Sequence, residues 1–250
     1  MFPCVRFRPA VLLLLSFSVL SVGHAQLYSP DGLGTNAPTN PSSIVTPNQG
    51  VPAAPEDPVT SMLRQGMQLF TQKQYDGALE QVNNAIKADP KNLGAYSLRG
   101  GIYSETKKWD LAAKDYQTIL QLDDKNVLAK FNLAEIKFRQ KFYDDARSGF
   151  LALEQDPDWG DLSSYKVFLC DLYGGHDDLA SKEHDAFDQI GSNASYYFSN
   201  AAWSLYHHQT EDGRSWLLSA VRIYPQTKVN LYAASLKDLG YLPLPPPPTP

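Results

Sequence analysis

Cysteine is scarce in this sequence of 250 residues, which contains only Cys4 and Cys170. Two cysteines in segments of such different character exclude a disulfide-stapled fold, and even a single bridge is not expected. Basic residues are outnumbered, because 22 Lys and Arg against 27 Asp and Glu give a net charge of −5. No segment is dense in Lys or Arg, so the basic face that nucleic-acid binding requires is missing. Glycine-rich phosphate loops, paired metal-binding cysteines and Gly-x-Ser-x-Gly elements are also absent.

The N-terminus has the composition of a secretory signal, assigned to residues 1–25. Arg6 and Arg8 precede an apolar stretch at residues 10–23, and Gly23-His24-Ala25 supplies small residues before a cleavage point at Gln26. The apolar stretch is shorter than the ~20 residues of a spanning helix, so a cleaved signal is favoured over a membrane anchor. We expect an exported chain, periplasmic or secreted, with the bacterial envelope preferred and no membrane span after cleavage.

Two segments flank the expected globular part. Residues 26–58 are rich in Pro, Asn, Gly, Ser and Thr and have no apolar periodicity, so they are predicted to be a disordered linker. At the other end, residues 241–250 form a Pro-rich tail, with six prolines in its last eight residues. The tail is expected to be an extended polyproline II stub, either a solvated end or a ligand for an aromatic-lined groove.

The strongest signal is an internal period of 34 residues. Small residues recur at Gly66, Gly100 and Ala134, and alanines at Ala78, Ala112, Ala146 and Ala180. Aromatic residues recur in the same phase at Tyr75, Trp109 and Tyr143, and so do lysines at Lys73, Lys107 and Lys141. This frame gives five units that start at residues 59, 93, 127, 161 and 195, within a repeat domain at residues 59–240.

Each unit is predicted to be a pair of antiparallel helices joined by a turn near the recurrent lysine. Apolar residues follow helical spacing on both sides of that turn, and Asp and Pro separate successive units. A small residue in each helix allows the pair to cross closely, so Gly66 should face Ala78. One such pair cannot bury its apolar face alone, and the units must therefore stack.

A further amphipathic helix is expected at residues 228–239, ending before Gly240. Its role would be to cover the apolar end of the array by packing on the second helix of unit five through Trp216, Ala220 and Ile223. The alternative is that this helix is released to dock on a partner.

The recurrent residues resemble the tetratricopeptide repeat. The resemblance covers units one to three well. Phe168 replaces the small residue in unit four, and Arg214 replaces the second-helix alanine in unit five. It implies an all-α fold, an α-solenoid in the form of a right-handed superhelix, whose first helices line a concave groove. Such repeats are scaffolds with many different partners, so the resemblance is specific for fold and weak for function.

The resemblance also implies which first-helix positions face the groove. These positions carry aromatic, apolar and charged side chains that suit a binding surface. The predicted partner-binding residues are Leu63, Met67, Phe70, Phe131, Glu135, Phe138, Arg139, Tyr165, Leu169, Tyr173, Tyr196, Trp203 and Tyr206. In units four and five, the aromatic residues could instead pack as core. The Lys and Asn of the subtype that clamps a carboxylate are replaced by Leu63 and Met67 in unit one, so that role is not supported.

One constellation raises a different class of function. His176 and Asp177 lie at a turn, and His184 follows on the next helix, so the three could ligate a metal. The alternative is that the acid caps the helix while His184 packs, and this reading is favoured, with no metal or cofactor expected. Asn193-Ala194-Ser195 also fits a glycosylation sequon, a tripeptide that is common by chance.

The sequence therefore predicts a non-enzymatic, exported scaffold that binds a protein or peptide segment in its concave groove, in cell-envelope assembly. The alternatives are a metal-binding protein or enzyme centred on His176, Asp177 and His184, and a structural spacer without a ligand groove.

Overall fold

The structure is a computed structural model that describes residues 57–190 and 193–243. Within these ranges the chain forms eleven α-helices and no strand. The helices are α2 (Pro58–Thr71), α3 (Tyr75–Ala88), α4 (Leu93–Glu105), α5 (Trp109–Leu122), α6 (Val127–Arg139), α7 (Tyr143–Leu151), α8 (Gly160–Gly174), α9 (Asp177–Ile190), α10 (Ala194–Tyr206), α11 (Thr210–Ile223) and α12 (Gln226–Asp238).

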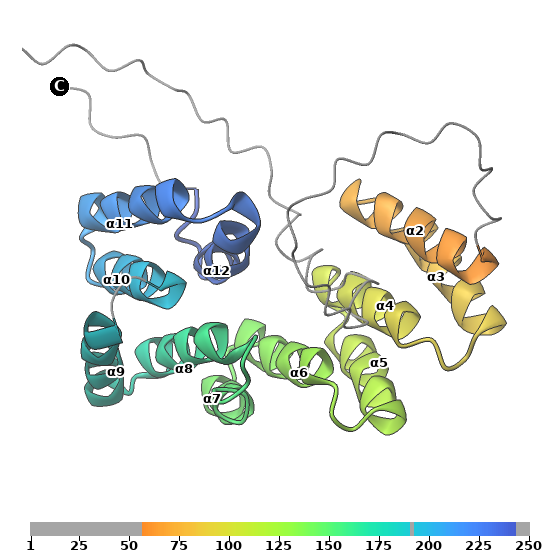
Figure 1. The fold of residues 1–250 in the computed structure, drawn as a ribbon, viewed down its shortest axis with the longest axis horizontal. Coiled ribbons are helices and arrows are strands. Elements are labelled where there is room, and N and C mark those ends of the chain that lie inside the picture. Colours follow the sequence, from red (N-terminus) through yellow and green to blue (C-terminus); the bar gives the residue numbers. More distant parts are fainter. Residues whose placement is uncertain (1–56, 191–192, 244–250) are drawn as a thin grey trace, which may run out of the picture.

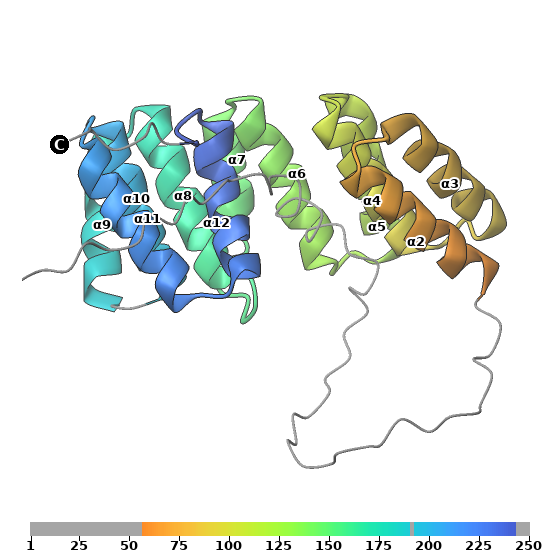
Figure 2. The same cartoon turned by 90° about the horizontal axis from the view of Figure 1, so that it is seen from above.

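The helices stack in sequence order along an arc, which is the α-solenoid that the repeats predict (Figure 1). The first helices α4, α6 and α8 face the inside of the arc and the second helices α5, α7 and α9 lie outside it, while α11 lies at the end of the array (Figure 1). The final helix, α12, lies on the inner side, next to α10 and α11 (Figures 1 and 2). The predicted signal, most of the predicted linker and the end of the Pro-rich tail lie outside the described residues. No described helix has the length and apolar character needed to cross a bilayer.

The first helices α2, α4, α6 and α10 begin at a side-chain cap that the sequence supplies, whereas α8 begins after Trp159 without one. Asn92 Oδ1 accepts a hydrogen bond from the Ala95 amide at 3.0 Å, and Asn126 accepts the equivalent bond from Ala129 at 2.9 Å. Asp57 caps α2 in the same way, and Pro58 takes the first helical position, where its missing N–H is harmless. The Asn and Asp residues that precede these helices therefore fix where units one, two, three and five start.

The recurrent lysines mark the turns inside the units. Lys73, Lys107 and Lys141 have backbone φ angles of 61°, 58° and 66°, in the left-handed region that an L-residue rarely adopts. Gly175 takes this position in unit four with φ 83°. The side chains of the three lysines are exposed beside the carbonyl end of the first helix, where a positive charge interacts favourably with the helix dipole.

Gly66 faces Ala78 as expected, since a Cβ on Gly66 would lie 3.6 Å from the Ala78 carbonyl oxygen, but the closest contacts at these crossings are with other residues. A Cβ on Gly66 would lie 3.0 Å from Val82 Cγ2, and one on Gly100 would lie 2.8 Å from Tyr116 Cζ. The small residue of the first helix thus leaves room for the larger side chain of the second helix, which lies one turn after the recurrent alanine. The alanines themselves are fully buried, as Ala78 and Ala112 at 0% exposure show.

The fifth unit starts one residue earlier than the strict 34-residue frame. Its left-handed turn residue is His208, which follows Gly175 by 33 residues. The small residues of this unit are therefore Ala201 and Gly213, and Arg214 does not occupy the alanine position. Consistent with the shift, Ala220 is 0% exposed whereas Leu218 is 41% exposed.

The C-terminal helix packs differently from the expected arrangement. Tyr232 of α12 lies against Phe198 of α10 and Tyr165 of α8, with ring centroids 5.3 and 5.4 Å apart. Ile223, which was expected to hold the cap, is 53% exposed. The apolar side of α12 therefore turns toward the concave side of the arc, where Tyr232 packs against aromatic rings of α8 and α10.

Candidate partner-binding face

The predicted groove residues divide into two classes by burial. Side chains that are less than 6% exposed are closed to a partner unless a neighbouring helix moves; these are Leu63, Phe70, Phe131, Glu135, Phe138, Tyr165 and Leu169. Side chains that are partly exposed remain available for contact; these are Met67, Arg139, Tyr173, Tyr196, Trp203 and Tyr206.

Arg139 lies where the first two units meet the rest of the chain. Its Nη1 donates to Glu105 Oε1 of α4 at 3.2 Å, and its Nε lies 3.5 Å from Asp238 Oδ2 of α12. The guanidinium also lies 5.1 Å from the centroid of the Trp109 ring. This predicted groove residue therefore connects helices that are far apart in the sequence.

A buried ion pair crosses from unit four to unit three. Lys166 Nζ donates to Glu135 Oε2 at 2.5 Å, with side-chain exposures of 3% and 5%. The ammonium also faces the rings of Phe138 and Phe150 at 4.8 and 5.8 Å. Glu135 was expected to face a ligand, and Lys166 was not singled out, because its position faces neither the groove nor a second helix in the regular repeat.

Asp161, at the start of α8, is the centre of a hydrogen-bond network that no sequence motif indicated. Its Oδ1 accepts from Asn193 Nδ2 at 2.6 Å and from Ser195 Oγ at 2.5 Å, and its Oδ2 accepts from the Tyr232 hydroxyl. Burial and the neighbouring carboxylate raise the pKa of the Tyr232 phenol, so it stays protonated and donates. Asp161 thereby links α8, α10 and α12.

The same network accounts for the sequon residues. Asn193 Oδ1 accepts from the Tyr196 amide at 3.0 Å and so caps α10 while its Nδ2 is bound to Asp161. Attaching a glycan to Nδ2 would remove a donor from this network. The sequon is thus explained by helix capping.

The one-residue shift of unit five redirects two of the predicted groove residues. A shift of one residue rotates a side chain by about 100° around a helix. Tyr196 accordingly packs on Trp216 of α11 at 5.5 Å, and Trp203 stacks on His184 of α9 at 4.8 Å. Phe198 takes the concave position instead, and it is 0% exposed. The sequence did hold a signal for this shift, since Asn193 precedes α10 as Asn92 and Asn126 precede their helices.

Several partly exposed tyrosines lie close together near the C-terminal ends of the first helices α8 and α10. The Tyr173 ring lies 5.3 Å from Tyr206, 6.1 Å from Tyr241 and 6.4 Å from Tyr143. Burial raises the pKa of Tyr173, so its hydroxyl remains a neutral donor at physiological pH. Both predicted residues in this set, Tyr173 and Tyr206, contact each other and leave part of their rings exposed.

His176 and His184 point to different neighbours. His176 Nδ1 lies 2.9 Å from Asp171 Oδ1, and its Nε2 lies 3.5 Å from Asp144 Oδ1. His184 stacks on Trp203, and burial lowers its pKa. Across residues 57–190 and 193–243, no group of three His, Cys, Asp or Glu side chains is placed to hold a metal ion. The hypothesis of a metal site at His176, Asp177 and His184 therefore finds no support in this geometry.

The acid side chains near His176 form a structural charge cluster. Arg147 Nε donates to both carboxylate oxygens of Asp171 at 2.8 Å, and Arg147 Nη2 lies 3.5 Å from Glu183 Oε1. Burial, followed by the charge of Asp171, raises the pKa of Glu183 to about 8. Burial likewise raises the pKa of Cys170, which keeps this thiol protonated and unreactive.

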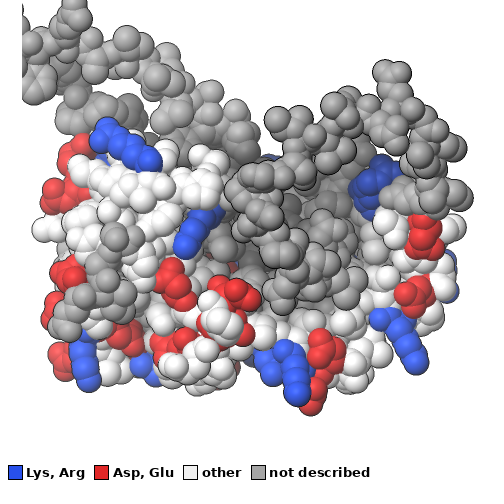
Figure 3. Space-filling view, in the orientation of Figure 1, with Lys and Arg blue, Asp and Glu red and all other residues white. Residues whose placement is uncertain are grey.

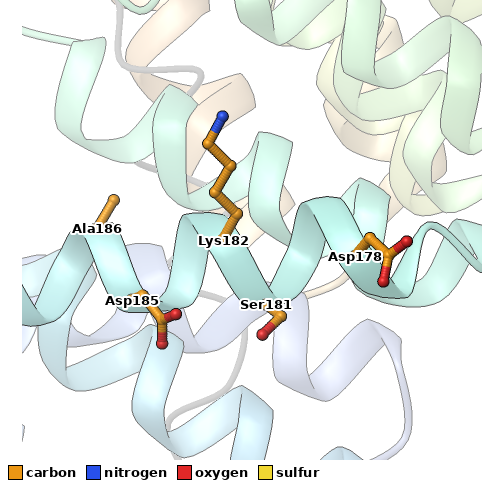
Figure 4. Close-up of a pocket in the computed structure, with 5 residues that line it drawn as sticks. All are labelled: Asp178, Ser181, Lys182, Asp185 and Ala186. Atoms are coloured by element: carbon orange, nitrogen blue, oxygen red, sulfur yellow. The ribbon is translucent and has the colours of Figure 1, made fainter.

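The side chains of the outer helix α9 do not converge on a common point. A depression on α9 is lined by Asp178, Ser181, Lys182, Asp185 and Ala186, all from one helix, and their side chains point apart (Figure 4). On the face shown in Figure 3, acidic and basic side chains are interspersed over the described helices.

Two overlapping segments, residues 63–126 and 103–161, match the tetratricopeptide repeat family. This part of the chain therefore carries tetratricopeptide repeats. The Hsp70-Hsp90 organizing protein 1 of Glycine max is 30% identical over 93 residues, which are 37% of this chain. The chain spans only 16% of the length of that relative.

Two solved structures have similar folds. One is described as PilW, a widely conserved type IV pilus biogenesis factor, with a TM-score of 0.53, 18% identity, and coverage of 72% of this chain and 86% of that one. The other is pilF of Pseudomonas aeruginosa, with a TM-score of 0.52, 15% identity, and coverage of 74% and 93%. At this level of identity the similarity extends to the fold, an all-helical solenoid of tetratricopeptide type.

Proposed function

We propose that this chain is an exported, non-enzymatic scaffold that binds a protein segment on the concave face of its solenoid and acts in cell-envelope assembly. The observation that carries the proposal is the inner face formed by the first helices of the stacked repeats, of which α12 covers the part on α8 and α10. Repeats of this kind bury their own core and leave an extended surface for a partner. The tetratricopeptide repeats at residues 63–161 support a role in protein–protein interaction.

The envelope assignment rests on two further observations. The first 25 residues have the charge and hydropathy pattern of a secretory signal. In addition, the solved structure named PilW has a similar fold and is described as a type IV pilus biogenesis factor. A scaffold of an envelope assembly is consistent with both.

The contact surface is tested by site-specific cross-linking in the organism that encodes the chain. A photoreactive side chain at Met67, which is partly exposed on α2, should form an adduct with a partner protein. The same group at Leu111, which is 45% exposed on the outer helix α5, serves as the matched control. Equal capture from the two positions would contradict binding on the concave face.

Export is tested separately by sequencing the N-terminus of the chain recovered from fractionated cells. The proposal predicts an envelope or secreted fraction and a mature chain that begins at Gln26. A chain that keeps Met1 and remains in the cytoplasm would contradict export while leaving the interaction role intact.

A further inference from the structure

The final helix α12 covers an aromatic surface that belongs to the concave face. We call this the α12-binding surface and define it by Asp161 and Tyr165 of α8 and Phe198 of α10. Tyr165 and Phe198 are 0% exposed, and Tyr232 of α12, at 2% exposure, lies between 5 and 6 Å from both rings. The surface thus combines two aromatic rings with a carboxylate that accepts from the Tyr232 hydroxyl.

The helix that occupies this surface has a simple recognition pattern. Val229, Tyr232 and Leu236 are the buried large side chains of α12, at 5%, 2% and 0% exposure, and they follow the i, i+3, i+7 spacing of one helix face. Asp238, six residues after the tyrosine, lies 3.5 Å from Arg139 Nε. The surface therefore selects an amphipathic helix with an apolar stripe, a tyrosine hydroxyl and a carboxylate near its C-terminal end.

Two hydroxyl groups at the contact with α12 make no hydrogen bond. The Tyr165 hydroxyl and Ser235 Oγ of α12 are buried without a hydrogen-bond partner. Burying an unpaired hydroxyl costs free energy, so these groups oppose closure of the interface. In addition, α12 contacts α10 and α11 less extensively than the paired helices of the repeats contact each other. It is also the last described helix and is joined to the solenoid on one side only.

We infer that α12 is an exchangeable occupant of a helix-binding surface, and that a partner protein's amphipathic helix of the same pattern replaces it. The inference rests on the proposed function, in which the concave face binds protein, and adds the chemistry of the bound segment. A partner helix that also donates or accepts at Tyr165 would bind more favourably than α12. The attached helix α12 competes with every partner for this surface. The apparent affinity for a partner therefore equals the intrinsic affinity multiplied by the fraction of chains in which α12 has left the surface.

The test uses the full chain and a labelled peptide that carries residues 225–242 of this sequence as the probe. Tyr232→Ala in the chain removes the side chain that holds α12, whereas Lys228→Ala removes an exposed side chain of the same helix. Fluorescence anisotropy should show at least tenfold tighter peptide binding to the Tyr232→Ala chain than to the wild type or the Lys228→Ala chain. A peptide with the same tyrosine replaced by alanine should not bind.

Equal affinities in the three chains, or no binding to a folded Tyr232→Ala chain, would overturn the inference. Stable dimers that exchange α12 between copies would also overturn it, in favour of self-association. If Tyr232→Ala prevents folding, hydrogen exchange of the wild type decides: amides of α12 should exchange at least tenfold faster than those of α10, and equal rates would overturn the inference. None of these outcomes alters the cross-linking test at Met67, so the two proposals fail separately.

Discussion

The two helices of a pair pack against each other differently in units one to three and in unit four. In the earlier units, small residues let the helices of a pair approach, as at Gly66 and Gly100. In unit four, Phe168 takes the small position and packs on Phe187 at 5.9 Å and on His184 at 6.1 Å, and α8 and α9 are less closely packed than other pairs. Units one to three are therefore stabilised by close contact within each pair, and so is unit five, where a Cβ on Gly213 would lie 2.7 Å from Leu205 Cγ. Unit four depends more on its aromatic contacts, including that of Tyr165 with α12 on the concave side.

The charged side chains show the same difference. Arg99 of α4 donates to Asp115 of α5 at 2.7 and 2.9 Å, and its side chain remains 21% exposed. Lys166 of α8 is 3% exposed and pairs with Glu135, which is 5% exposed. A charge that keeps contact with water tolerates loss of its partner, whereas a buried charge does not. The carboxylates of both pairs are buried, since the Asp115 side chain is 4% exposed, so the two pairs differ in the burial of the cation.

The largest effect is expected from Lys166→Met. It leaves the Glu135 carboxylate buried without its cation, which should reduce the free energy of unfolding by about 3–5 kcal/mol. Lys137→Met is the matched control, since the Lys137 side chain is 47% exposed and 3.9 Å from Asp145, and should cost less than about 0.5 kcal/mol. Urea denaturation followed by circular dichroism measures both. Adding Glu135→Leu to Lys166→Met should restore much of the loss, and equal losses for the two single variants would contradict the burial argument.

Ala112→Leu should be the next most damaging change. Ala112 is 0% exposed at a close helix crossing, and overpacking such a site costs about 1–3 kcal/mol. Ala88→Leu adds the same atoms at an exposed position on α3 and should leave the melting temperature nearly unchanged. If both variants melt at the same temperature, tight crossings do not stabilise the regular units.

Glu183→Gln should change how stability depends on pH. The folded-state pKa of Glu183 is raised to about 8, so the folded chain retains a proton that the unfolded chain has already lost. This contribution is fully present below the unfolded-state pKa and is lost as pH rises through about 8. As pH rises from the unfolded-state pKa to about 8, the free energy of unfolding of the wild type should therefore decrease relative to that of the variant. Arg147, Asp171 and Glu154 also interact with Glu183 and are unchanged in the variant. Parallel pH profiles of the two proteins would show that Glu183 does not titrate in this range.

The smallest effect is expected at the turns. Lys107 has a φ angle of 58°, whereas unit four has Gly175 at the equivalent position. Lys107→Gly should raise the melting temperature slightly, since glycine adopts this conformation without steric cost, although its greater flexibility in the unfolded chain offsets part of the gain. Gly175→Lys should destabilise by roughly 1 kcal/mol, the cost of a left-handed L-residue. Thermal melts should show a higher melting temperature for Lys107→Gly and a lower one for Gly175→Lys.

The sequence was sufficient to predict the helical solenoid, because the 34-residue columns report packing that repeats in every unit. It predicted the turns at Lys73, Lys107 and Lys141 for the same reason. The concave face was less predictable, since Asp161, Lys166 and Tyr232 act through contacts across the arc that have no fixed spacing. The repeat before α10 is one residue shorter, which moves Tyr196 and Trp203 away from that face. In the sequence, only the position of Asn193 indicates this shift.

The central claim is that α12 closes the concave face over α8 and α10, and removal of α12 tests it most directly. A chain truncated after Tyr224 should melt at a lower temperature and associate in light scattering, because Tyr165 and Phe198 become exposed. A chain truncated after Pro243 keeps α12 and serves as the control, with the melting temperature and mass of the full chain. If the chain that ends at Tyr224 is as stable and as monomeric as this control, α12 does not cover the face and the account is contradicted.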